Sequence, residues 1–236
     1  MFRIKHKQEG RDLLEDVFGW DVQTWSKALE LWEPHVAGKP ELRCLEVGAN
    51  KGGLSLWLAM HDHHVVCSDL QNPKQNCIET HAQYQVSHLI EYQSFNAKEE
   101  PVDGFYDIII FKSILGGIGR DGRNDLQVQT IKNLQDHLRS GGKLLFAENL
   151  QGSWLHKLAR KTFVKWGRSW RYLHVDEVEE LLADFENVEW KTTGWAAAFV
   201  RKGWLKNIAV WKDRIIFNWL MSSRSKYVVY GVAQKK

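Results

Sequence analysis

The segment Leu45-Glu46-Val47-Gly48-Ala49-Asn50-Lys51-Gly52-Gly53 joins two different hydrophobic patterns. Its first residues belong to the run 43–47, which predicts a strand, and after it Leu54, Trp57 and Leu58 recur at helical spacing. Glycine at position 48 lets the chain turn at the strand end, and glycine at position 52 lets the backbone pass close to a ligand. The segment therefore predicts a glycine-rich turn that opens a helix, where parallel sheets bind nucleotides.

Asp69 points to a ligand that contains ribose. It ends a second predicted strand, 64–69, and lies 21 positions after Gly48. An acidic side chain at this distance can accept hydrogen bonds from both hydroxyls of a ribose. Asn50 stands where the dinucleotide fingerprint G-x-G-x-x-G has its second glycine, which disfavours NAD and FAD. The turn also lacks the Gly-Lys-Ser/Thr ending of a phosphate-binding loop.

The rest of the chain alternates short apolar strands with helical patterns. Further strands are predicted at 88–92, 106–111, 143–147 and 226–232, and helices around Ile131, Leu134 and Leu138, closed by Ser140-Gly141-Gly142, and around Val178, Leu181, Leu182 and Phe185. This alternation favours an α/β fold with a mostly parallel sheet, covered by helices on both faces. Residues 1–40 are expected to form a helical leader that packs on the sheet or covers the site, and residues 41–236 a single domain.

Several motifs, taken in their order along the chain, resemble those of class I S-adenosylmethionine-dependent methyltransferases. Segment 46–52 matches the E-x-G-x-x-x-G loop of that family, Asp69 its acidic residue after the second strand, and Asn96 its polar residue before the third helix, where Asp is more common. The fourth and fifth strand patterns match at 105–113 and 138–145. The resemblance implies a three-layer Rossmann-like fold with a seven-stranded, mostly parallel sheet whose last strand is antiparallel.

The same resemblance implies that the chain is a methyltransferase and that its cofactor is S-adenosylmethionine. The residues that it assigns to cofactor binding are Glu46, Gly48, Ala49, Asn50, Gly52, Asp69, Leu70, Asn96, Ala97 and Lys112. It implies that Asp69 binds the ribose and that Asn96 meets the adenine amino group, whose hydrogen bond an amide oxygen can accept.

The end of the fourth predicted strand bears on the methyl acceptor. It reads Phe111-Lys112-Ser113-Ile114-Leu115, without the Asp/Asn-Pro-Pro-aromatic motif of enzymes that methylate the amines of bases. Lys112-Ser113 also replaces the first acidic ligand of metal-dependent relatives, so no metal is expected. A base near a hydroxyl acceptor helps to remove its proton, and the candidates that follow the fifth strand are Glu148, His156 and His174.

Charge and tryptophan are distributed unevenly along the chain. Residues 151–236 contain 16 Lys/Arg, 8 Asp/Glu and eight of the 12 tryptophans, which leaves residues 1–150 net acidic. Basic, Trp-rich helical insertions are expected at about 151–171 and 195–222. Such segments bind an anionic membrane surface, phosphates or an anionic acceptor, and indole rings also suit the apolar faces of sugars.

These features favour O-methylation of a small or saccharide-type acceptor, including an anionic, lipid-linked or surface-glycan sugar. The leader with Trp20-Asp21 and Trp25, and the stretch Trp170-Arg171-Tyr172-Leu173-His174, are loosely similar to methyltransferases of bacterial surface-glycan synthesis. Two alternatives stay open. One is a methyltransferase that acts on RNA or another nucleic acid through the basic half, with an affinity that falls steeply with salt. The other is a non-catalytic protein that binds the cofactor.

Cysteine usage and hydropathy indicate the compartment. Cys44, Cys67 and Cys77 form neither a disulfide framework nor a spaced metal set. No apolar run approaches the ~18–20 residues that cross a bilayer, and no apolar stretch of a secretory signal follows the first residues. A cytoplasmic protein is therefore expected, with no membrane span and at most a peripheral contact with a membrane.

Overall fold

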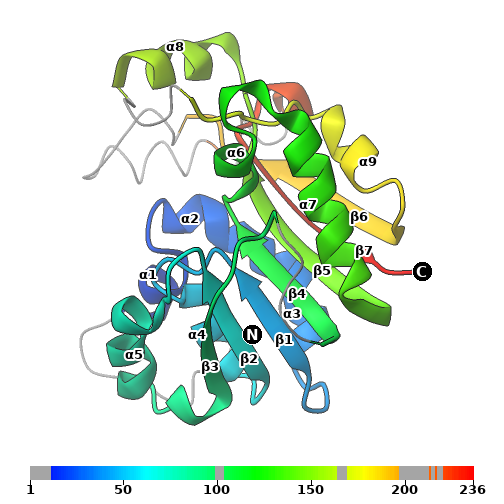
Figure 1. Cartoon of the computed structure of the whole chain (residues 1–236). Helices are drawn as coiled ribbons and strands as arrows, with labels where there is room; N and C mark the ends of the chain where they lie inside the picture. Colours follow the sequence, from blue (N-terminus) through cyan, green and yellow to red (C-terminus); the bar gives the residue numbers. More distant parts are fainter. Residues whose placement is uncertain (1–11, 99–103, 164–168, 197–212, 214–215, 217–219) are drawn as a thin grey trace.

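The computed structural model describes residues 12–98, 104–163, 169–196, 213, 216 and 220–236 (Figure 1). These residues form a seven-stranded sheet in the order β3-β2-β1-β4-β5-β7-β6. The strands are β1 (Arg43–Val47), β2 (His64–Asp69), β3 (Ile90–Ser94), β4 (Tyr106–Lys112), β5 (Leu138–Asn149), β6 (Glu186–Thr193) and β7 (Val228–Gln234). Strands β1 to β5 pair in parallel, and β7 pairs antiparallel with both β5 and β6. The expected α/β fold with an antiparallel last strand is confirmed.

Helices cover both faces of the sheet, which makes three layers (Figure 1). The α-helices are α1 (Leu13–Phe18), α2 (Val22–Trp25), α3 (Leu29–Val36), α4 (Gly53–Ala59), α5 (Lys74–Gln83), α6 (Leu115–Ile118), α7 (Asn124–Asp136), α8 (Trp154–Phe163) and α9 (Glu177–Leu181). Single 3-10 turns occupy Ser26–Ala28, Ser87–Leu89, Arg120–Gly122 and Ser223–Ser225. Successive side chains of a strand alternate between the faces, so Ile108 and Ile110 join the core of α1, α3 and α4, whereas Ile109 packs with α7 and α9.

The helices that precede β1 seal one face of the sheet. Trp32 of α3 is fully buried, and its indole N–H donates to the carbonyl oxygen of Gly231 in β7 at 3.0 Å. Its ring lies 6.0 Å from that of Trp57 in α4 and 6.5 Å from that of Phe18 in α1. Residues 12–36 are thus part of the main core. The division into residues 1–40 and 41–236 stays a prediction, and most of the insertion expected at 195–222 lies outside the described residues.

Several local predictions differ from the structure. Helix α7 ends at Asp136, and Leu138, expected in that helix, begins β5. Strand β5 continues through the glycine pair because the N–H of Gly141 donates to the Lys235 carbonyl oxygen and the N–H of Lys235 to that of Gly142. Strand β3 begins two residues later than expected, after a 3-10 turn. Strand β6 was not predicted, because its side chains are mostly exposed and polar.

Candidate functional site

The carboxyl ends of β1 and β4 form the switch point of the sheet. From β1 the chain adds β2 and β3 on one side, and it then crosses to the other side, where β4 and β5 pair. Loops diverge at such a point, and open parallel sheets bind their ligands there. The turn from Gly48 to Gly52 lies at this edge, between the end of β1 and the start of α4.

Glu46 fixes this turn to the helix that follows. Its side chain is buried, and its carboxylate accepts hydrogen bonds from the backbone N–H of Leu54 at 3.2 Å and of Ser55 at 2.8 Å. The hydroxyl of Ser55 donates to the same carboxylate. Burial raises the pKa of Glu46 to about 7, although the hydrogen bonds from Ser55 and Leu54 act in the opposite direction. Glu46 thus satisfies N–H groups of the first turn of α4, and its contact with a cofactor stays a prediction.

The two glycines of the turn adopt positive φ angles for which a side chain would be strained. Gly48 and Gly52 both have φ of +70°. A Cβ at Gly48 would lie 2.5 Å from Cγ2 of Ile114, and one at Gly52 would lie 2.7 Å from the His81 ring and 2.9 Å from Sγ of Cys77. Packing against α5 and the backbone angle therefore explain the glycine at 52. The sequence had suggested a different reason, the close approach of a ligand.

Asp69 lies next to the turn and holds its backbone. One carboxylate oxygen accepts a hydrogen bond from the N–H of Asn50 at 2.8 Å, and the other accepts one from the N–H of Leu70 at 2.7 Å. Asp69 is half-buried and the Leu70 side chain is 69% exposed. Each carboxylate oxygen has two acceptor positions, so Asp69 keeps capacity for the two hydroxyls of a ribose. The chemistry of this side chain fits the nucleoside of S-adenosylmethionine.

Asn96 and Ala97 come to the same edge. The N–H of Phe95 donates to the carbonyl oxygen of Asp69 at 2.9 Å, which places residues 96 and 97 beside the end of β2. Asn96 is half-buried, and its side-chain oxygen accepts a hydrogen bond from the N–H of Lys98 at 3.1 Å. The structure therefore brings together Asn50, Asp69 and Asn96, which the sequence assigns to one ligand.

Lys112, at the end of β4, meets two tryptophans that the motifs did not identify. Its Nζ atom lies 3.3 Å from the centre of the Trp20 ring and 5.0 Å from that of Trp25. Burial lowers the pKa of Lys112 to about 7, although the carboxylates of Glu46 and Glu148 favour its charged form. No local pattern predicts this contact, because Trp20 and Lys112 are far apart in the sequence.

Glu148, a candidate base, lies buried beside Lys112. Its side chain is 1% exposed, and its carboxylate accepts hydrogen bonds from the N–H groups of Leu115 and Asn149, both at 2.7 Å. Burial raises the pKa of Glu148 to about 7, and these hydrogen bonds act in the opposite direction. The group is ionisable near neutral pH, but its contacts hold the start of α6.

The two candidate histidines lie in different surroundings. His156 is buried in α8, where its ring nitrogens contact the Ser153 hydroxyl at 2.8 Å and the Trp195 carbonyl oxygen at 2.9 Å. Burial lowers the pKa of His156 to about 4, so its ring is neutral at physiological pH. The side chain of His174 is 44% exposed and contacts Asp176 at 3.1 Å. The structure does not bring either histidine into contact with the turn at Gly48.

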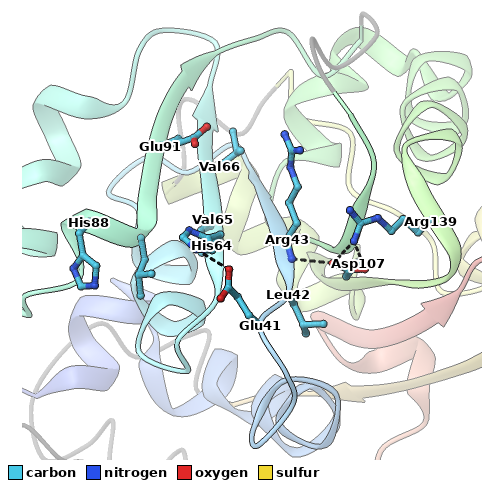
Figure 2. A pocket seen from close by; sticks show the side chains of 11 residues that line it. Glu41, Leu42, Arg43, His64, Val65, Val66, His88, Glu91, Asp107 and Arg139 are labelled. Carbon is cyan, nitrogen blue, oxygen red and sulfur yellow. Dashed lines mark hydrogen bonds and ion pairs between the residues drawn. The ribbon is translucent and has the colours of Figure 1, made fainter.

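A hollow lies at the opposite, amino edge of the sheet (Figure 2). It has a volume of about 510 Å³ and is lined by charged residues from the starts of several strands. Asp107 binds the Arg139 guanidinium at 2.8 Å and the N–H of Arg43 at 2.9 Å, and His64 contacts Glu41 at 2.8 Å. The sequence motifs did not point to this cavity, and its charged groups pair largely with one another.

In the part of the chain that the structure describes, no three His, Cys, Asp or Glu residues are grouped so that they could hold a metal ion. None of the helices in this part of the chain has the length and apolarity that crossing a bilayer requires.

Comparison with known proteins yields matches among solved structures. No family model and no curated protein matches the sequence. Phosphoethanolamine N-methyltransferase 2 of Haemonchus contortus, solved with S-adenosyl-L-methionine, is 15% identical over 94% of this chain and 56% of its own, with a TM-score of 0.61. The N-methyltransferase NodS of Bradyrhizobium japonicum is 14% identical over 89% of this chain and 94% of its own, with a TM-score of 0.56.

A third protein with this fold is named for a reaction other than methyl transfer. The [4+2]-cyclase SpnF is 15% identical over 94% of this chain and 91% of its own, with a TM-score of 0.61. The chain spans only 56% of the length of the Haemonchus enzyme. The activity of that enzyme therefore does not follow for this chain from the shared fold. The strand order, the antiparallel β7 and these matches agree. This chain has the fold of the class I S-adenosylmethionine-dependent methyltransferases.

Proposed function

We propose that this chain is an S-adenosylmethionine-dependent methyltransferase that methylates a hydroxyl group of a small or saccharide-type acceptor. The observation that carries the cofactor assignment is Asp69. Its half-buried carboxylate holds the N–H of Asn50 at the switch point and keeps acceptor positions for a ribose. The fold supports the same assignment, since the Haemonchus methyltransferase was solved with S-adenosylmethionine.

The residues of the proposed site divide the work of binding between strands. Asp69 at the end of β2 accepts hydrogen bonds from the ribose hydroxyls. The side-chain oxygen of Asn96, which lies beyond β3, accepts a hydrogen bond from the adenine amino group. Leu70, whose side chain is largely exposed, offers an apolar contact to the adenine ring. When bound, S-adenosylmethionine supplies a methyl group that its sulfonium already activates, so the chain acts mainly by holding the two reactants in line.

Lys112 is the group that we assign to the proton of the acceptor hydroxyl. It lies at the switch point, and its pKa of about 7 gives a neutral amine in useful amounts near neutral pH. The hydroxyl oxygen would bond to the methyl carbon as the bond from that carbon to the sulfonium sulfur breaks, with S-adenosylhomocysteine as the leaving group. The hydroxyl proton would pass to the Lys112 amine, which becomes an ammonium ion beside Glu46 and Glu148. Glu148 is less suited to this step because its carboxylate is buried under the start of α6.

Aromatic surface near the site supports a sugar as acceptor. The Trp20 side chain is 49% exposed beside Lys112, and an indole face packs well on the apolar face of a sugar ring. The nucleic-acid alternative has less support, because Arg160 and Arg171 of the basic half are used inside the fold. Arg160 donates to the carbonyl oxygen of Leu150, and Arg171 pairs with Glu177.

An acceptor screen tests this proposal. The protein is incubated with S-adenosylmethionine and, separately, with neutral sugars, phosphorylated sugars, lipid-linked sugars and RNA, and products are identified by mass spectrometry. We expect a methyl ether on a sugar, formed much more slowly by Lys112→Met. If RNA were the only substrate methylated, the acceptor would be a nucleic acid and the proposed sugar acceptor would be wrong. Cofactor binding without any methylated product would favour the non-catalytic alternative.

A further inference from the structure

Helix α8 is anchored through polar side chains on its inner face. His156 is 2% exposed and contacts the carbonyl oxygen of Trp195. Arg160, one turn later, donates to the carbonyl oxygens of Leu150 at 2.7 Å and Gln151 at 3.0 Å. Its guanidinium also lies 3.9 Å from the centre of the Tyr172 ring. These contacts fix which side of the helix faces the protein.

The outer face of α8 carries two exposed apolar side chains. Trp154 is 70% exposed and Leu158 is 55% exposed, and the two are four residues apart, so they share one face. At about 100° per residue they lie on the side of the helix opposite His156 and Arg160. A surface helix of a globular protein normally has the reverse arrangement, with apolar residues inward and charged residues outward.

The charges of the chain segment that contains α8 have one sign. Residues 149–175 contain six Lys/Arg and no Asp/Glu. Arg160 and Arg171 are used inside the fold, whereas Lys157, next to the apolar pair, is exposed. The face therefore combines an indole, a leucine and a lysine. A large indole suits the boundary between headgroups and acyl chains, and lysine suits lipid phosphates.

We propose that the outer face of α8, formed by Trp154, Lys157 and Leu158, rests on an anionic lipid surface. An exposed leucine gains little from a nucleic acid, whose surface is a row of phosphates, whereas Leu158 and Trp154 both gain by leaving water for the acyl boundary. Helix α8 follows the carboxyl end of β5, so this contact would bring the proposed site close to a lipid-linked acceptor. The contact itself does not depend on methyl transfer.

Vesicle co-sedimentation tests the inference without any methyl acceptor. The full chain is mixed with vesicles of pure phosphatidylglycerol or pure phosphatidylcholine at low and at high salt. We expect binding to phosphatidylglycerol, weaker binding at high salt and little binding to phosphatidylcholine. The double variant Trp154→Ser/Leu158→Ser should bind phosphatidylglycerol vesicles at least about tenfold more weakly, and Lys157→Gln should reduce the salt dependence.

A matched control removes exposed apolar side chains elsewhere. Phe105 and Val128 are 56% and 52% exposed, and Phe105→Ser/Val128→Ser should bind vesicles like the wild type. Calorimetry with S-adenosylmethionine and thermal unfolding should be unchanged in the α8 variant, which separates this test from the proposed function. The inference would be overturned if the wild type did not bind vesicles, or if the α8 variant bound them equally well. It would also be overturned if the wild type formed an RNA complex or a dimer that the α8 variant failed to form.

Discussion

The Nζ atom of Lys112 lies 3.3 Å from the centre of the Trp20 ring. Lys112 is the last residue of β4, and Trp20 lies between α1 and α2. A cation over an indole face is attracted by the negative charge of the ring, more strongly where water is partly excluded. This contact connects the helices that precede β1 to the switch point of the sheet, where the motifs place the cofactor.

A double-mutant cycle on Trp20→Leu and Lys112→Met should give a coupling energy of about 1 kcal/mol in the free energy of unfolding. Each single change removes the contact between the cation and the ring, so the double variant should lose less than the sum of the two. Denaturant unfolding of the four proteins at about pH 6, below the Lys112 pKa of about 7, measures this coupling for the charged amine. Additive single effects would show that the two side chains do not stabilise one another.

Glu148→Gln should change how stability depends on pH. The pKa of Glu148 is about 7 in the folded protein, above its ordinary value of 4.5, so the folded state holds an extra proton between these values. The free energy of unfolding therefore falls as the pH rises through this window, and Gln removes this loss. Denaturation at about pH 5 and about pH 7.5 should show the variant gaining on the wild type at the higher pH. Glu179→Gln, an exposed change in α9, is the control and should show no such gain.

Gly52→Ala should destabilise the protein more than Gly141→Ala. Gly52 has a φ of +70° and Gly141 a φ of +74°. An alanine in this left-handed conformation is destabilised by about 1–2 kcal/mol. A Cβ at Gly52 also meets His81 and Cys77 at under 3 Å, whereas one at Gly141 meets no atom within 4 Å. Denaturant unfolding should show an additional loss of about 1–3 kcal/mol at Gly52. Equal losses in the free energy of unfolding would mean that His81 and Cys77 of α5 move to accommodate the new methyl group.

The sequence was most informative where a pattern is local. Three such patterns each occupy a short segment: the strand at 43–47, the turn from Gly48 to Gly52 and the acidic end of β2. The strand order of the structure agrees with the fold that these patterns predicted. Strand β6 could not be predicted, because it is an exposed strand with the polar sequence Glu-Asn-Val-Glu-Trp-Lys-Thr-Thr and lacks an apolar alternation.

The site was harder to predict where it depends on contacts between distant segments. The contact of Trp20 with Lys112 has no signature in the chain, and neither has the burial of His156 against Trp195. The basic segment after β5 was recognised, but the sequence could not show that Arg160 is turned inward while Trp154 is exposed. That difference depends on acceptors that the backbone offers at Leu150 and Gln151.

Calorimetric titration with S-adenosylmethionine tests the assignment of the cofactor edge most directly, when the wild type is compared with Asp69→Ala and Glu91→Ala. Asp69 lies at the carboxyl edge, and Glu91 lines the hollow at the amino edge (Figure 2). We expect the wild type and Glu91→Ala to bind alike, and Asp69→Ala to bind at least about tenfold more weakly, since it loses charged hydrogen bonds to the ribose. Wild-type protein that does not bind the cofactor, or affinity that depends on Glu91 and not on Asp69, would contradict the assignment.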